Sequence, residues 1–153
     1  MIIDVQKLNP DGEWFEGDES ASILDLESDR FFKVSEPIHY QLFAQPLSDR
    51  LVVKGSLRLP LQAQCGRCAE FFSTSVEENS FLRAYEISEA TETVDVTPDI
   101  REDILVQVPH YPVCSPECRG LCPQCGTNLN LASCACRPSS DLRWSALDNA
   151  GLG

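Results

Sequence analysis

The cysteines are the residues of this chain whose number and spacing point to a chemical role. Six of the eight cysteines lie in "CSPECRGLCPQCGTNLNLASCAC", residues 114–136, and the other two form "CGRC" at residues 65–68. Two thiolates separated by two residues can turn toward one tetrahedral ion, and a following glycine, here Gly126, permits the tight backbone of a metal knuckle. Eight thiolates are enough for two four-coordinate zinc ions. The predicted metal ligands are Cys65, Cys68, Cys114, Cys118, Cys122, Cys125, Cys134 and Cys136.

The eight cysteines can be divided between the two ions in more than one way. The division favoured by sequence proximity gives one ion to the last four cysteines, at residues 122–136. The other ion then joins the pair at residues 65–68 to Cys114 and Cys118. Cys118 could instead trade places with Cys136, because two thiolates one residue apart are a less common pair of ligands.

Other uses of cysteine fit the chain less well. Disulfides are not required, since 153 residues can bury a core, and closely paired cysteines in a reducing compartment are more often metal ligands. A thiol-disulfide oxidoreductase places its CxxC at a helix start within a βαβ unit, whereas "CGRC" joins predicted antiparallel strands. Eight free or packing thiols would not need such regular pairing.

Groups suited to catalysis are scarce. Four thiolates saturate a zinc ion and leave no coordination position for a reactive water. His39 falls within a predicted strand and His110 follows Pro109 in a predicted loop. The carboxylates between Glu77 and Asp103 show no acid-base spacing and are interpreted as a solvated face, and no glycine-rich phosphate loop is present. We therefore expect a non-enzyme with no catalytic residues and no bound cofactor other than zinc.

The charge is strongly negative and unevenly distributed. The formal net charge is -12, but residues 114–153 carry three basic and three acidic residues, so the whole surplus lies in residues 1–113. Nucleic-acid binding draws most of its free energy from Lys and Arg at phosphates, which an acidic body would repel. A basic protein partner, such as a ribosomal protein or assembly factor, fits this charge better. An acidic balance that only keeps the protein soluble is the alternative.

A zinc ribbon that reads RNA directly is the second functional hypothesis. Such ribbons surround their knuckles with basic and aromatic side chains. This tail offers only Arg119, Arg137, Arg143 and Trp144 for that purpose.

The expected compartment is the cytoplasm. No apolar run approaches the roughly 20 residues that span a bilayer, and the start "MIIDVQKLNPDGEWFEGDES" lacks the features of a signal peptide. Neither a membrane partner nor a small-molecule substrate is expected.

Antiparallel strands are predicted to position the first cysteine pair. Residues 51–65 alternate apolar and polar side chains, with Pro60 on the polar face as the sign of an edge or bulge. Residues 37–45 alternate too, and "PLSDR" between these runs has turn chemistry. Residues 69–87 would run back along the same strand and place Cys65 and Cys68 at a hairpin tip. "MIIDVQKL" and "SDRFFKV" are weaker strand candidates.

One helix is predicted at residues 97–108, and the predicted domain boundary lies just after it, near residue 110. Thr97 is the expected N-cap, Pro98 the first helical residue, and Pro109 the stop. Its apolar stripe consists of Ile100, Ile104, Leu105 and Val108.

The predicted fold class is therefore α+β: a mostly antiparallel sheet or small barrel with one main helix and a zinc-stapled C-terminal segment. An acidic β domain would cover residues 1–110. A cysteine-rich zinc-binding segment, with a short terminal helix at "SSDLRWSALDN", would cover residues 111–153.

These features together resemble the YceD family, the large ribosomal RNA subunit accumulation proteins of bacteria, with relatives in chloroplasts. The resemblance rests on the "CxRC" motif at a strand end, on "DIREDILVQVP", on "CRGLCPQCGTNLN" with "CAC", and on "DLRW". It covers roughly residues 30–150. Many members read Asp-Pro-Arg where this chain has "DLR".

The resemblance implies a role in ribosome biogenesis. It implies support for the synthesis, processing or accumulation of 23S rRNA, without enzymatic activity. Since some members lack most of the C-terminal cysteines, it also implies that the metal stabilises the fold.

Overall fold

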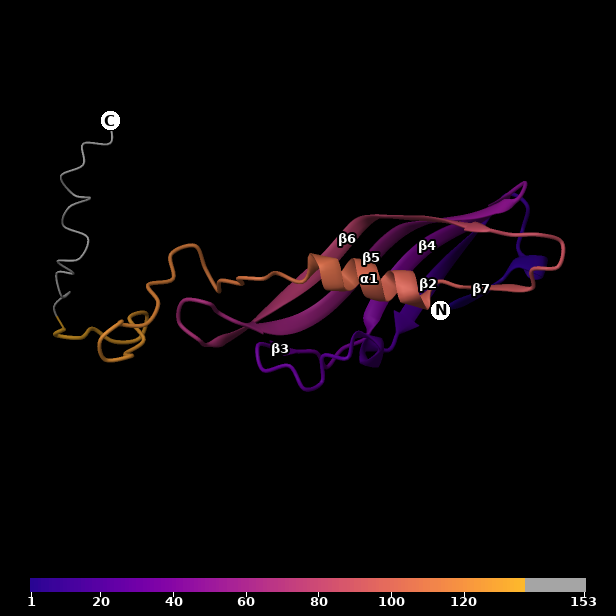
Figure 1. Ribbon diagram of the computed structural model, residues 1–153. Coiled ribbons are helices and arrows are strands. Elements are labelled where there is room, and N and C mark those ends of the chain that lie inside the picture. The colour runs from indigo at the N-terminus through magenta and orange to yellow at the C-terminus, as the bar shows by residue number, and fades with distance from the viewer. Residues whose placement is uncertain (137–153) are drawn as a thin grey trace, which may run out of the picture.

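The computed structural model describes residues 1–136 of the chain. The predicted terminal helix at residues 139–149 lies outside the described residues, as do Arg137, Arg143 and Trp144. The described part contains a five-stranded antiparallel sheet, a two-stranded sheet and one α-helix (Figure 1). The predicted class, a mostly antiparallel sheet with one main helix, is confirmed.

Three long strands form the centre of the larger sheet. β4 (Ile38–Leu47) turns at residues 48–49 into β5 (Arg50–Gln64), and β6 (Phe71–Glu86) then runs back along the other side of β5. This order and both turns are as predicted. The "CGRC" motif therefore lies in the loop at the end of the β5–β6 hairpin.

One face of β5 is buried and the other faces solvent. The buried residues are Leu51, Val53, Leu57, Leu59, Leu61, Ala63 and Cys65. Burying an apolar side chain of this size contributes about 1.5 to 3 kcal/mol, so the alternation fixes the register of the strand. Pairing with β4 ends at Arg58 and pairing with β3 (Phe32–Lys33) starts at Gln62, so Pro60 lies where that side of β5 has no partner among the described strands. The bulge of this strand lies at residues 55–57 instead.

Shorter strands complete the two sheets. β2 (Glu13–Glu19) pairs with the outer side of β4. β1 (Ile2–Asp4) and β7 (Thr93–Asp95) form the two-stranded sheet. Two 3-10 helices, η1 (Val5–Lys7) and η2 (Ala21–Leu24), join these elements. The candidates "MIIDVQKL" and "SDRFFKV" therefore each contribute only a short strand, and β2 and β7 were not predicted.

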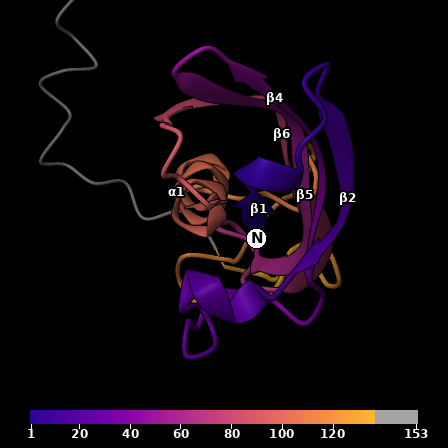
Figure 2. The same cartoon turned by 90° about the vertical axis from the view of Figure 1, so that its right-hand side faces the viewer.

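Helix α1 (Thr97–Gln107) packs in the concave side of the curved sheet (Figure 2). Ile100 and Ile104 are fully buried in the core, and Leu105 and Val108 pack against it. The predicted stripe is thus the buried face of the helix. Because α1 occupies the concavity and the described strands do not close on themselves, the sheet is not the small barrel considered as an alternative.

The start of α1 differs from the prediction. Val96, and not Thr97, occupies the N-cap position, and it has no side chain that could cap. The carboxylate of Asp95 instead accepts a hydrogen bond of 2.9 Å from the amide of Thr97. Hydrogen bonds from Thr97 lower the pKa of Asp95. Asp95 therefore takes the capping role at the start of α1 that was predicted for Thr97.

Several carboxylates between residues 77 and 103 are not simply solvated, which corrects the earlier interpretation. Glu78 is only 9% exposed, and its Oε1 accepts hydrogen bonds of 2.6 Å from both the amide and the hydroxyl of Ser80. Its Oε2 accepts one of 2.7 Å from Gln107, which links β6 to α1. The bonds from Ser80 hold the pKa of Glu78 below its usual value.

A second polar cluster joins β6 to the other end of the helix. Arg83 donates to Asp99 at 3.0 Å and also to Asp103, and the hydroxyl of Tyr85 donates to Asp99 at 2.6 Å. The two aspartates lie one helical turn apart, so one guanidinium reaches both. No helix among residues 1–136 is long and apolar enough to cross a membrane.

Candidate metal centres

The β5–β6 loop holds the first cysteine pair in a tight turn. The amide of Ala69 donates to the carbonyl of Cys65, and the amide of Cys65 donates to the carbonyl of Glu70, both at 2.9 Å. Ala69 has a φ of 61°, the left-handed conformation that closes the knuckle. Both thiols, of Cys65 and Cys68, are buried beneath the loop.

The chain after α1 runs to this loop (Figure 1). It brings a second pair of thiols there. The Sγ atoms of Cys65 and Cys118 are 3.8 Å apart, as are those of Cys68 and Cys114. A tetrahedral ion with metal–sulfur bonds of about 2.3 Å places its sulfur atoms about 3.8 Å apart. The four Sγ atoms all lie within 4.8 Å of one another, and none forms a disulfide. The geometry of this tetrad therefore fits one tetrahedral metal ion.

Arg67, between the two cysteines of the loop, fastens the incoming chain. Its Nη1 donates to the carbonyls of Pro116 at 2.8 Å and Cys118 at 3.2 Å. Its own carbonyl accepts the amide of Leu121 at 3.0 Å. Sequence reasoning missed this role, since spacing singles out the cysteines of "CGRC" and not the residues between them.

Hydrogen bonds to sulfur favour the thiolate at Cys65. Burial by itself raises the pKa of Cys65, but backbone amides, including those of Cys114 and Arg67 at 3.4 Å, bring it to about 6. The hydrogen bond with Cys118 and the loss of solvent raise the pKa of Cys114 to about 12. Burial also opposes the thiolate at Cys118, but hydrogen bonds, the largest effect coming from Asn130, lower the pKa of Cys118. The tetrad thus favours the thiolate at two of its cysteines, and four thiolates together need a cation to offset their charge.

The second tetrad is formed by a local knuckle. The amide of Cys122 donates to the carbonyl of Thr127 at 2.8 Å, and the amide of Gly126 donates back to Cys122 at 2.9 Å. Gly126 has a φ of 73°, as its place after the second cysteine predicted. The hydroxyl of Thr127 lies 3.1 Å from the Sγ of Cys125 and lowers the pKa of that thiol to about 6.

The thiols of this second tetrad also converge. Cys122, Cys125, Cys134 and Cys136 place their Sγ atoms within 4.8 Å of one another, although only Cys122 is buried. The hydrogen bond with Cys125 raises the pKa of Cys136 to about 12, so a cation is needed to hold four thiolates together here as well. The structure groups all eight thiols in the division that sequence proximity favoured, and Cys118 does not trade places with Cys136.

Asn130 joins the two tetrads. It lies between the cysteine pairs of the second tetrad, yet its Nδ2 donates to the Sγ of Cys118 at 3.4 Å. Its Oδ1 accepts the amide of Arg119 at 2.8 Å. Such hydrogen bonds orient metal ligands from outside the coordination sphere. Asn130 was not predicted, because no pattern in the sequence marked it as a support for the first tetrad.

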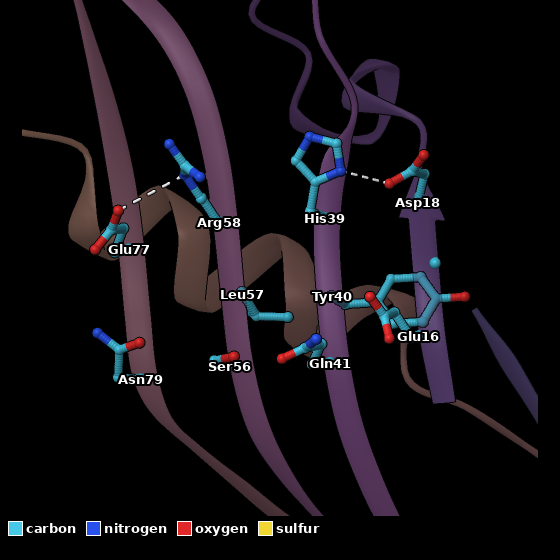
Figure 3. Close-up of a pocket in the computed structure, with 11 residues that line it drawn as sticks. Glu16, Asp18, His39, Tyr40, Gln41, Ser56, Leu57, Arg58, Glu77 and Asn79 are labelled. Carbon is cyan, nitrogen blue, oxygen red and sulfur yellow. Dashed lines mark hydrogen bonds and ion pairs between the residues drawn. The ribbon is translucent and has the colours of Figure 1, made fainter. Parts of the chain in front are cut away.

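The two histidines lie away from both tetrads. His39 sits on the outer face of the sheet, 2.5 Å from Asp18, and His110 is exposed after α1. Figure 3 shows His39 in a polar groove with the Arg58–Glu77 pair. Within residues 1–136, each tetrad consists of cysteines alone. A metal held by four thiolates polarises no substrate, so the arrangement can bind metal and staple the chain.

Comparison with known proteins identifies the family. Residues 84–149 match the family described as "Large ribosomal RNA subunit accumulation protein YceD". This region of the chain belongs to the YceD family. The matched region runs from the end of β6 through α1 and includes six of the eight cysteines, while the two cysteines of the β5–β6 loop lie before it.

Relatives of this YceD protein occur in mycobacteria and in plants. An uncharacterized protein of Mycobacterium tuberculosis is 32% identical over 120 residues, which are 69% of this chain and 58% of that protein. A maize protein named "Large ribosomal RNA subunit accumulation protein YCED homolog 1, chloroplastic" is 42% identical over 50 residues, 32% of this chain and 17% of that protein. The chain thus spans 58% of the mycobacterial relative and much less of the plant one. No solved structure matches this chain.

Proposed function

We propose that this chain is a non-enzymatic ribosome biogenesis factor that supports synthesis, processing or accumulation of 23S rRNA. The name of the family and the names of two plant relatives refer to accumulation of the large ribosomal RNA subunit. The cysteine tetrads are coordinatively closed in this proposal, which fits a binding protein better than an enzyme. We place the protein in the cytoplasm, where bacterial ribosomes assemble.

We propose zinc as the ion of both tetrads, giving two ions per chain. The supporting observation is the 3.8 Å separation of the sulfur atoms within the first tetrad. Zinc has no redox chemistry, and thiolate is its preferred ligand in closed structural sites. Because the first tetrad joins the β5–β6 loop to residues 114–118, its ion would fix the cysteine-rich segment, residues 111–153, to the β domain, residues 1–110.

We propose that the protein acts on rRNA through a basic protein partner. The observation that carries this proposal is the confinement of the whole -12 surplus to residues 1–113. A ribosomal protein or assembly factor rich in Lys and Arg would be attracted to this surface, whereas the phosphates of RNA would be repelled. Direct binding of rRNA by the cysteine-rich segment is the competing mechanism.

Crosslinking in growing cells tests this function. A tagged protein, crosslinked and purified, should carry a large-subunit ribosomal protein or an assembly factor, and purified complexes should dissociate as salt rises. Depletion of the protein should lower 23S rRNA relative to 16S rRNA. Crosslinks to rRNA alone, with binding to naked rRNA that withstands salt, would replace the partner with the RNA-binding mechanism. An unchanged 23S level on depletion would contradict the proposed function.

A further inference from the structure

Strand β2 forms an open edge of the larger sheet (Figure 2). It pairs with β4 on one side, and no described strand pairs with its other side. In an antiparallel strand, alternate residues point their backbone N–H and C=O groups away from the partner. β2 therefore presents a row of groups to which an extended segment can add as a further strand.

The sequence of this edge, "EWFEGDE", selects the charge of an added strand. It carries four carboxylates and no Lys or Arg. Proteins commonly discourage edge-to-edge pairing with charged side chains, and those on β2 are all acidic. Glu13 and Glu16 form no ion pair with any described residue. A second copy of this edge would be repelled, because like charges would face each other, and a basic segment would be attracted.

An exposed tryptophan lies on the same strand. Trp14 is 66% exposed, and its ring packs against that of Phe43 of β4 at a tilt of 54°, with centroids 5.3 Å apart. The row continues across the sheet through Lys54, whose ammonium lies 5.6 Å from the Phe43 ring, to Leu82, which is 58% exposed. The exposed side chains of Trp14 and Leu82 thus lie on either side of the Lys54 ammonium, and such exposed apolar groups contribute to interaction surfaces.

A polar groove continues from this row over the same outer face (Figure 3). It has a volume of about 610 Å³ and is lined by side chains of β2, β4, β5 and β6. Its lining includes the carboxylates of Glu16, Asp18 and Glu77 against the single guanidinium of Arg58. The groove therefore has the same sign of charge as the β2 edge.

We propose that the β2 edge and the adjoining outer face bind an extended, basic protein segment. The segment pairs with β2 as an added strand, places Lys or Arg beside Glu16 and Asp18, and packs an apolar side chain on Trp14. This inference rests on the proposed function in one respect, since it names where the basic partner docks.

Synthetic peptides test the site without assuming a particular partner. The probe is a strand-forming peptide of about ten residues whose one face carries Arg at two neighbouring positions and Val at the next, with Thr along the other face, and its counterpart has Glu in place of Arg. The chain has two tryptophans, so a Trp144→Phe background leaves Trp14 as the sole fluorescent reporter. The Arg peptide should change the fluorescence of Trp14 and protect the amides of β2 from hydrogen exchange, and the Glu peptide should do neither.

Variants locate the binding site. In that background, the double variant Glu16→Lys/Asp18→Lys should bind the Arg peptide about tenfold more weakly, because two attractions become repulsions. The matched control Glu89→Lys/Glu92→Lys makes the same charge change in the exposed loop after β6 and should bind within about twofold of the parent. Equal binding by all three proteins, or protection that avoids β2, would overturn the proposal.

Backbone methylation tests the added strand itself. Methylating alternate amides along one edge of the Arg peptide removes the donors that face β2, whereas methylating the other set leaves them. One of the two methylated peptides should bind and the other should not. Equal binding by both would show charge attraction without strand pairing and would contradict the proposal.

A further experiment distinguishes a failure of this binding site from a failure of the proposed function. Purified large-subunit ribosomal proteins and a 23S rRNA fragment are offered to the parent and to Glu16→Lys/Asp18→Lys. Peptide binding at β2 without capture of any ribosomal protein would keep the site and count against the proposed partner. Equal capture of a ribosomal protein by both proteins would keep the partner and remove this site. Occupation of β2 by the rRNA fragment would overturn the choice of a protein segment.

Discussion

Each cysteine tetrad depends on side chains that are not themselves ligands. Asn130 donates to the sulfur of Cys118 and accepts the amide of Arg119, so a residue of the second knuckle holds a ligand of the first tetrad. Arg67 fastens the backbone of the same segment from the β5–β6 loop. These contacts restrict where Cys118 can lie before an ion binds, which lowers the entropy cost of assembling the site.

Asn130→Asp should weaken the first metal site. The substitution keeps the oxygen that accepts from Arg119, but it replaces the donor to Cys118 with a carboxylate next to thiolates. Loss of such an outer hydrogen bond typically lowers metal affinity about 10 to 100-fold. Competition with a coloured zinc chelator measures the change, and Asn79→Asp, an exposed site on the sheet, supplies the matched control. Equal zinc affinity in both variants would show that Asn130 does not support the site.

Two glycines of the cysteine-rich segment should differ in their tolerance of alanine. Gly120 and Gly126 have nearly equal φ values of 74° and 73°, so alanine costs each about 1 kcal/mol of backbone strain. A Cβ on Gly120 would also lie 3.1 Å from the carbonyl oxygen of Arg67, whereas one on Gly126 would meet no atom within 4 Å.

Gly120→Ala should therefore release zinc at a lower urea concentration than Gly126→Ala. Zinc release to a chelator during urea unfolding measures this difference. The reverse order would mean that the contact between residues 67 and 120 does not hold the segment in place.

The spacing of the cysteines favoured the observed grouping of the thiols but left an exchange of Cys118 with Cys136 open. The second tetrad was predictable because ligands close in sequence need little chain to converge. The contributions of Arg67 and Asn130 were not predictable in this way. Each acts on a partner in a distant part of the chain, at 49 to 51 residues for the Arg67 guanidinium and 12 for the Asn130 amide. No local pattern reports such pairs.

Among the elements, those with a buried face were predictable and those at the periphery were not. β5 and α1 bury apolar residues at the periods of a strand and a helix, so burial imposes the pattern that sequence analysis reads. β2 carries four carboxylates and a glycine because one side of it stays open, and β7 has only three residues. The N-cap of α1 was assigned to the wrong residue for a different reason. Asp95 and Thr97 both have side chains suited to capping, and the sequence does not distinguish them.

Arg83 should contribute more to stability than Arg58, although both pair with carboxylates. The Arg83 side chain is 32% exposed and reaches Asp99 and Asp103 of α1, while the Arg58 side chain is 62% exposed and lies 3.6 Å from Glu77. Arg83→Met should lower the free energy of unfolding by about 1 to 3 kcal/mol, since it removes the donor to Asp103 and leaves Asp99 with the hydroxyl of Tyr85 alone.

The matched change Arg58→Met should cost less than about 1 kcal/mol. Urea denaturation of the zinc-loaded proteins measures both values. Equal losses would mean that the Arg83 cluster does not anchor α1 to β6.

At the scale of the whole molecule, the first tetrad joins parts of the chain that lie 46 to 53 residues apart. The proposed boundary near residue 110 falls between its two halves, so the ion would act as the main link between the β domain and the cysteine-rich segment. The closure of the sheet could not be predicted from strand patterns, because alternation is the same in open and closed sheets. In the structure, α1 occupies the concavity of the sheet, and the sheet stays open.

Removal of metal should therefore release one part of the molecule and leave the other folded. With a chelator at neutral pH, amides of residues 111–136 should lose protection from hydrogen exchange, while those of β4, β5 and β6 should keep theirs. The apolar core of the sheet contains no cysteine ligand, because Cys65, Cys68 and Cys118 form a separate buried cluster, and the core should therefore persist. Loss of protection throughout residues 1–110 would show that the two parts do not fold separately.

X-ray absorption at the zinc edge tests the central claim most directly, because it reports the identity of the metal and its ligands in the purified protein. We predict two zinc ions per chain, each surrounded by four sulfur atoms at about 2.3 Å with no oxygen or nitrogen neighbour. That result would establish both tetrads as closed structural sites. A folded protein without zinc, or a zinc ion with an oxygen or nitrogen ligand, would contradict it.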